Sequence, residues 1–188
     1  MRSGNSISAR IDGPSFEICI LAGGMSRRMG RDKSRLKIGR RTMLGQIRAT
    51  AKAVGIPVRV IRKDDVSRCG PLGGIYTALK TTRAKAVLFL ACDMPFMTAE
   101  LIHRVLREFG EVNQALFAYT TEGAGFPFAL RRDTLPIIVE QIEKREFALR
   151  KLARRFKARR MRMSSKWRMQ LQNINTPEEY ESVSRINR

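Results

Sequence analysis

The chain has 188 residues and 43% of them are hydrophobic, enough for one sizeable core and too many for a disordered protein. Its formal net charge is +20, with 37 lysines and arginines against 17 aspartates and glutamates. Such a surface attracts polyanions without selecting among nucleotides, phosphorylated metabolites, RNA and acidic proteins. No apolar run approaches the roughly 20 residues that a membrane-spanning helix needs, so we expect no membrane partner.

The N-terminal segment, residues 1–15, is polar and lacks the apolar stretch of a secretory signal. We expect it to be a flexible tail, followed by one domain over residues 16–188. The three cysteines, Cys19, Cys69 and Cys92, are odd in number and widely spaced. This favours reduced thiols in a cytoplasmic protein, with Cys19 and Cys92 inside buried strands. A zinc site is disfavoured because there is no CxxC pair and only one histidine.

Apolar runs and helical periodicity alternate along the chain. Strands are predicted over residues 16–22, 58–61, 86–92, 115–119, 126–130 and 159–163. Helices are predicted over residues 42–54, 71–79, 99–109, 134–156 (in two pieces) and 177–186. This order predicts a three-layer, Rossmann-like α/β fold with a mostly parallel central sheet and helices on both faces. In such sheets, ligands bind beyond the carboxyl ends of the strands, so the segments that follow the first three strands are the candidate site.

The loop after the first strand, LAGGMSRRMGRDK, combines paired glycines with positive charge. Gly23 and Gly24 allow backbone N–H groups to approach an anion closely. Arg27, Arg28 and Lys33 add cations near that backbone. The loop therefore suits a triphosphate, although it matches neither the P-loop nor the G-x-G-x-x-G pattern.

Two further segments carry carboxylates. The stretch DDVSRCGPLGGI begins at Asp64, and a carboxylate there could accept the two N–H groups of the Watson–Crick edge of guanine, which cytosine and adenine do not present as a pair. Either Asp64 or Asp65 could accept these N–H groups, or both aspartates could be solvated loop residues. The stretch LFLACDMPF places Asp93 directly after the most apolar strand. Asp93 could cap a helix, but beside the other segments it is better interpreted as a magnesium ligand, because Mg²⁺ favours one or two carboxylates with phosphate oxygens and waters.

These three segments resemble the signatures of the molybdenum cofactor guanylyltransferase family, in the strings LAGGxSxRMGxDK, GPLGG and CDMPF. The family belongs to the nucleotidyltransferases that join a nucleoside monophosphate to a phosphorylated acceptor, and the resemblance covers residues 16–180. It implies a nucleotidyltransferase fold, GTP as substrate, Mg²⁺ as cofactor and the terminal phosphate of molybdopterin or the molybdenum cofactor as acceptor. Pyrophosphate would leave, and a guanine dinucleotide cofactor would form.

The resemblance also implies a role for each matching residue. Catalysis would involve Arg28, Lys33 and Asp93, with Asp93 as the metal ligand. The nucleotide-binding residues would be Leu21, Ala22, Gly23, Gly24, Lys33, Asp64, Gly70 and Asp93. Asp65 is the rival of Asp64 for contact with guanine. Candidate partners besides the two substrates are other cofactor-biosynthesis proteins and molybdoenzyme chaperones.

One departure from the family pattern leaves the acceptor open. The family usually has histidine before the proline of its middle segment, and this chain has Phe126 before Pro127. Another phosphorylated acceptor, such as a sugar phosphate, is therefore the alternative. A non-catalytic basic RNA-binding protein on the same fold is an alternative of another class. It is disfavoured because the charged motifs remain in place and no compact RNA-binding signature is present, so nucleic acid is not an expected partner.

Three features near the C-terminus each allow two interpretations. The basic segment 144–168 predicts an amphipathic helix with a solvated face, or a surface for an anionic substrate or partner. Trp167 either packs within the protein or stacks on a bound base or pterin. Asn175, in the family-like string NINTPEE, lies near the metal or acceptor, or belongs to a plain capped helix start with Thr176 as N-cap.

Overall fold

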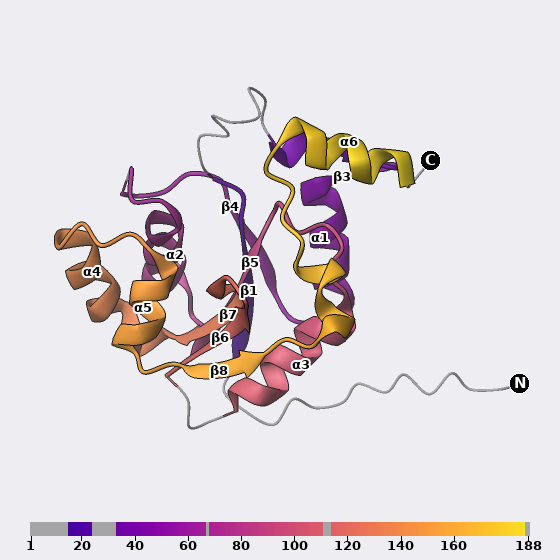
Figure 1. Ribbon diagram of the computed structural model, residues 1–188. Coiled ribbons are helices and arrows are strands. Elements are labelled where there is room, and N and C mark those ends of the chain that lie inside the picture. Colours follow the sequence, from indigo (N-terminus) through magenta and orange to yellow (C-terminus); the bar gives the residue numbers. More distant parts are fainter. Residues whose placement is uncertain (1–14, 24–32, 67, 111–113, 187–188) are drawn as a thin grey trace, which may run out of the picture.

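The computed structural model describes residues 15–23, 33–66, 68–110 and 114–186. Six of its strands form one sheet in the order β4-β1-β5-β7-β6-β8, and β2 and β3 form a separate hairpin (Figure 1). The strands are β1 (Phe16–Leu21), β2 (Lys37–Ile38), β3 (Arg41–Thr42), β4 (Val58–Ile61), β5 (Ala86–Ala91), β6 (Ala115–Thr120), β7 (Gly123–Arg131) and β8 (Arg159–Arg162). Neighbouring strands in the sheet run parallel except at β7, which is antiparallel to both β5 and β6.

Helices cover both faces of this sheet. They are α1 (Met43–Ala53), α2 (Pro71–Thr81), α3 (Ala99–Phe109), α4 (Leu135–Glu143), α5 (Leu149–Arg155) and α6 (Pro177–Ile186), with short 3-10 helices η1 (Lys33–Arg35), η2 (Arg132–Thr134), η3 (Ser165–Trp167) and η4 (Met169–Leu171). One apolar cluster joins α1 and α3 to the sheet, and a second joins α2, α4 and α5 to its other face. Figure 1 shows the two groups on opposite sides, with α6 beside the β2–β3 hairpin.

Burial on both faces explains the sequence of the central strands. All six residues of β5 are buried, and β1 is buried except for the partly exposed Glu17. Strands that are covered on both sides need continuous apolar runs, and parallel pairing through helical connections produces that covering. On one face, the rings of Phe89 and Phe117 stack against Phe128 with centroid separations of 4.9 and 4.6 Å.

The structure confirms the mostly parallel α/β architecture and modifies several local predictions. The stretch predicted as a loop before α1 contains the β2–β3 hairpin. The basic segment 144–168 is not one helix: α5 has only seven residues and the chain then enters edge strand β8. Trp167 is 4% exposed and lies in the core, which supports packing over stacking on a ligand. The predicted tail lies outside the described residues except for Ser15.

The cysteines form no disulfide among the described residues, and they differ in their surroundings. Cys19 is fully buried in β1, and burial raises its pKa to about 12, with the nearby Glu17 charge adding to the shift. Cys69 is also buried, but Cys92 is only partly buried, because β5 ends one residue before it. Among the described residues, no helix combines the length and apolarity needed to cross a membrane.

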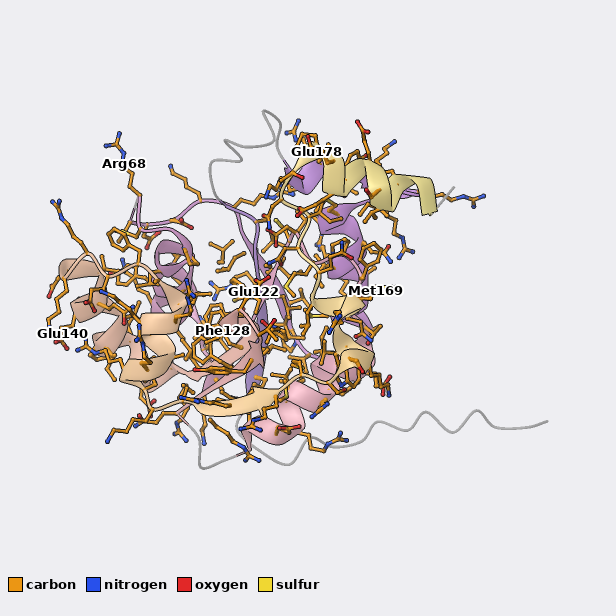
Figure 2. The ribbon with its side chains drawn as sticks, in the orientation of Figure 1. Arg68, Glu122, Phe128, Glu140, Met169 and Glu178 are labelled. Atoms are coloured by element: carbon orange, nitrogen blue, oxygen red, sulfur yellow. The ribbon has the colours of Figure 1, made fainter. Side chains whose placement is uncertain are left out.

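We predict that Phe128→Ala lowers the free energy of unfolding by about 3–5 kcal/mol, because it removes the ring shared by two stacked pairs and leaves a cavity. Urea denaturation followed by circular dichroism measures this loss. The control is Met169→Ala, at a side chain that is 70% exposed, with an expected change within about 0.5 kcal/mol. Figure 2 shows Phe128 among the central side chains and Met169 at the periphery. Equal effects of the two variants would contradict this account of the core.

Candidate active site

Sheet order brings three separate chain segments to one edge. Strand β1 lies between β4 and β5 and runs parallel to both, with Leu21 level with Ile61 on one side and Ala91 on the other. Adjacent strands lie about 4.8 Å apart. The segments that follow these strands therefore start side by side at the carboxyl edge, where α/β folds bind ligands.

Asp64 lies between the first loop and the start of α2. A Cβ built on Gly23 would lie 3.4 Å from Asp64 Oδ1, and one on Gly74 would lie 3.3 Å from the same atom. A Cβ on Gly73 would lie 2.9 Å from Asp64 Oδ2 and only 2.5 Å from the carbonyl oxygen of Val66. Glycine at these positions therefore lets the carboxylate fit closely against both backbones.

Asp65 points to different partners. Its backbone N–H donates to Thr77 Oγ1 at 2.9 Å, and its carboxylate pairs with Lys80 at 3.3 Å on the exposed side of α2. Burial raises the pKa of Asp64, and the neighbouring Asp65 charge raises it further. The geometry thus separates two adjacent aspartates that the sequence left as rivals, and it leaves Asp64 facing the sheet edge.

The second half of the site lies at the end of β5. Lys33 Nζ donates to Asn175 Oδ1 at 2.6 Å and lies 3.9 Å from Asp93 Oδ2. Burial raises the pKa of Asp93, and the Lys33 charge acts in the opposite direction. The backbone N–H of Ile174 donates to the Asp93 carbonyl oxygen at 2.9 Å, which ties the C-terminal segment to the end of the strand.

Two predicted nucleotide-binding residues have defined backbone roles. The N–H of Ala22 donates to the carbonyl oxygen of Ile61 at 2.8 Å, so it completes the sheet and is not a free donor for phosphate. Gly70 is the N-cap of α2 with φ +56°, a left-handed conformation that favours glycine directly before Pro71. Gly24, Arg27 and Arg28 lie outside the described residues.

An open depression of about 1450 Å³ lies next to the Lys33–Asp93 pair of charges, since Met94, which follows Asp93, and Asn175, which binds Lys33, are both in its lining. Its lining includes Met94, Phe126, Arg150, Arg168, Asn175 and Glu179. The cations come from α5 and from the segment between η3 and η4, and Glu122 lines it from the β6–β7 turn (Figure 2). The sequence motifs did not single out Arg150 or Arg168, because nothing in their spacing distinguishes them from the other arginines of the basic segment.

The donor set suits a magnesium ion that is completed by its substrate. Within the described ranges, no three carboxylates, histidines or cysteines gather in a group that could hold a metal by themselves. Asp93 supplies one carboxylate at the sheet edge, and Mg²⁺ in nucleotide sites is usually held by one or two carboxylates with phosphate oxygens and waters. A sheet edge of this kind, with glycines, a lysine and a carboxylate beside one another, is suited to binding a nucleotide together with a metal ion.

Comparison with known proteins identifies the family. The model of the MobA-like NTP transferase domain matches residues 18–166. A molybdenum cofactor guanylyltransferase of Syntrophotalea carbinolica is 32% identical over 88% of this chain and 89% of its own length. A probable molybdenum cofactor guanylyltransferase of Pelotomaculum thermopropionicum is 33% identical, over 55% of this chain and 62% of its own length. The chain therefore belongs to the MobA-like NTP transferase family, and within it to the molybdenum cofactor guanylyltransferases.

Solved structures share this fold. A protein of Aquifex aeolicus superposes with a TM-score of 0.70 at 26% identity, covering 85% of this chain and 93% of that one. The molybdopterin-guanine dinucleotide biosynthesis protein A of Archaeoglobus fulgidus has a TM-score of 0.69 at 16% identity, covering 90% and 97% of the two chains. The second likeness supports the fold alone.

We predict that Gly73→Ala destabilises the protein by about 1–2 kcal/mol. The added methyl would meet the Val66 carbonyl and the Asp64 carboxylate, and this clash exceeds the gain of about 1 kcal/mol that alanine brings to a helix interior. The control is Gly125→Ala, where a Cβ meets no atom within 4 Å. Chemical denaturation compares the two, and a Gly73→Ala variant as stable as the wild type would refute the close fit of Asp64.

Proposed function

We propose that this chain transfers GMP from GTP to the terminal phosphate of molybdopterin or the molybdenum cofactor. An oxygen of the acceptor phosphate attacks the α-phosphorus of GTP, and the bond between that phosphorus and the oxygen bridging to the β-phosphate breaks. Pyrophosphate carries away the bond electrons, and a guanine dinucleotide forms. Because the acceptor oxygen is already anionic, the reaction needs no strong general base.

The observation that carries the proposal is the convergence of the three motifs. Asp64, which follows β4, lies against Gly23, which follows β1. Lys33 lies close to Asp93, which follows β5 on the other side of β1. A base bound at Asp64 and phosphates bound at Lys33 and Asp93 would span the carboxyl ends of β4, β1 and β5. An extended nucleoside triphosphate could lie across the ends of these three strands.

In the proposed reaction, Lys33, Asp64 and Asp93 each interact with a different part of the substrate or its metal ion. The ammonium group of Lys33, oriented by Asn175, neutralises phosphate charge that develops as pyrophosphate departs. The Asp64 carboxylate accepts the N1–H and amino N–H groups of guanine and so selects GTP. Asp93 holds Mg²⁺, which when bound supplies charge neutralisation at the phosphates. Catalysis then depends on positioning and electrostatics, with Arg28 as a further proposed cation of the first loop.

The depression beside Asp93 suits the acceptor. Its cations Arg150 and Arg168 would attract a phosphorylated ligand, and Met94 and Phe126 offer apolar surface to a ring system. Phe126 packs against Phe128 with a centroid separation of 4.9 Å, so the residue that departs from the family pattern forms part of this wall. For this reason another phosphorylated acceptor remains the second candidate, with the nucleotide half of the site unchanged.

We expect the purified protein to form a guanine dinucleotide from molybdopterin, Mg²⁺ and GTP, and no product from CTP or ATP. Asp93→Ala and Lys33→Ala should each reduce turnover by at least about 100-fold, because each removes a charge at the reacting phosphates, while circular dichroism shows a retained fold. Mass spectrometry of the product provides the measurement. Near-wild-type turnover by either variant would remove that residue from the mechanism, and GTP binding without product would favour another acceptor.

We also expect GTP affinity to fall on acidification at a higher pH than an ordinary aspartate would cause. Asp64 accepts guanine N–H groups only when ionised, and its pKa is raised by burial and by Asp65, so protonation starts sooner as the pH drops. Calorimetric titrations across pH 4–8 measure this dependence. Asp64→Asn should bind GTP weakly and should show no such pH dependence. The matched Asp65→Asn variant should bind GTP well. The reverse order would assign guanine recognition to Asp65.

A further inference from the structure

The start of α6 has more hydrogen bonds than a helix cap needs. Glu179 N–H donates to Thr176 Oγ1 at 3.2 Å, and Thr176 N–H donates to Glu179 Oε2 at 3.1 Å, which is the reciprocal pattern of a capping box. The same Oε2 also accepts the backbone N–H of Asn175 at 2.5 Å. Asn175 precedes the cap residue, so this third bond fixes the chain just outside the helix.

That extra bond acts on a residue of the active site. The Asn175 side chain accepts the hydrogen bond of Lys33 Nζ at 2.6 Å, and Lys33 and Asn175 are 142 positions apart in the chain. The backbone orientation of Asn175 therefore determines where its amide oxygen, and with it the Lys33 ammonium group, is held. Glu179 is the residue that holds this backbone from the helix side.

Contacts on either side of Asn175 anchor α6 to the chain segments that carry Asp93 and Lys33. The preceding residue, Ile174, is fully buried and bonds to the Asp93 carbonyl oxygen. On the helix, Tyr180 Oη donates to the carbonyl oxygen of Lys37 at 2.7 Å, and Val183 packs with Ile38. The helix is thus attached both to the end of β5 and to the hairpin that follows Lys33.

We propose that Glu179 is a positioning residue for the transfer reaction: its carboxylate fixes the Asn175 backbone, so that the Asn175 amide holds Lys33 beside Asp93. This inference rests on the proposed function for its kinetic consequence. Its structural content, the dependence of Lys33 on Glu179 through Asn175, can be measured without turnover.

The matched control is Glu178→Ala. Glu178 is an exposed carboxylate in the same first turn (Figure 2), and among the described residues the Asn175 backbone N–H donates to Glu179 and not to Glu178. Both alanine variants remove one negative charge near the N-terminus of α6. Only Glu179→Ala releases the Asn175 backbone, and because the Glu179 charge also acts on Asp93, Glu179→Gln is the control for the loss of that charge.

The first experiment measures the acetylation rate of the Lys33 ε-amine by acetic anhydride, with peptide mass spectrometry. We expect a several-fold increase in Glu179→Ala and in Asn175→Ala, no further increase in the double variant, and no change in Glu178→Ala. Glu179→Gln should retain the wild-type rate, since its amide oxygen can accept the same bonds. An unchanged rate in Glu179→Ala, or independent, multiplying effects in the double variant, would overturn the proposal.

The second experiment measures steady-state kinetics with GTP and molybdopterin. We expect Glu179→Ala to lower kcat by about 10- to 100-fold with little change in the KM for GTP, and to have no added effect in an Asn175→Ala background. A loss of helix stability alone would not depend on Asn175 in this way. Absence of turnover by the wild-type protein would contradict the proposed function, while the labelling experiment would still decide the role of Glu179.

Discussion

The parallel pairing of β1 with both β4 and β5 is the constraint on which the candidate site depends. It places the ends of three strands, which come from well-separated parts of the chain, at one edge of the sheet. This pairing requires both faces to be covered, and the helices that provide the cover also return the chain for each new strand. The apolar core and the polar site are therefore two consequences of the same topology.

At the edge, the ion pair that Asp93 makes among the described residues is a long one. The separation of 3.9 Å between Lys33 and Asp93 is too long for a strong hydrogen bond, and the amide of Asn175 takes the short contact with the lysine instead. A neutral partner orients the cation without cancelling its charge.

The high net charge is spread over the surface and is only partly compensated. On α4 and α5, Glu140 pairs with Lys144 and Arg155, and Glu146 pairs with Lys151, but exposed pairs of this kind add little stability. A more buried contact joins Arg59 of β4 to Glu17 of β1 at 2.8 Å and ties the edge strand to its neighbour. The remaining positive field favours the approach of anionic substrates from solution.

Several features could be predicted from the sequence because they depend on local or periodic signals. Continuous apolar runs indicated the buried strands, and alternation of strands and helices indicated the α/β class. The β2–β3 hairpin was missed because its two-residue strands are too short to show a pattern. The interpretation of segment 144–168 as an amphipathic helix holds only for the short α5, whereas the strand predicted over residues 159–163 is present as β8, which pairs with β6 in a non-local contact that propensity does not register.

For the site, the sequence by itself determined which residue types are present and that glycines, cations and carboxylates follow the strands. Only the tertiary structure distinguishes the surroundings of Asp64 and Asp65, since Asp64 lies against Gly23 and Gly73 whereas Asp65 pairs with Lys80. The tertiary structure also brings Asn175 into hydrogen-bond contact with Lys33, although the two residues are 142 positions apart in the sequence. Local sequence specifies chemistry and backbone preference, whereas the distance between two side chains is set by the packing of the elements that carry them.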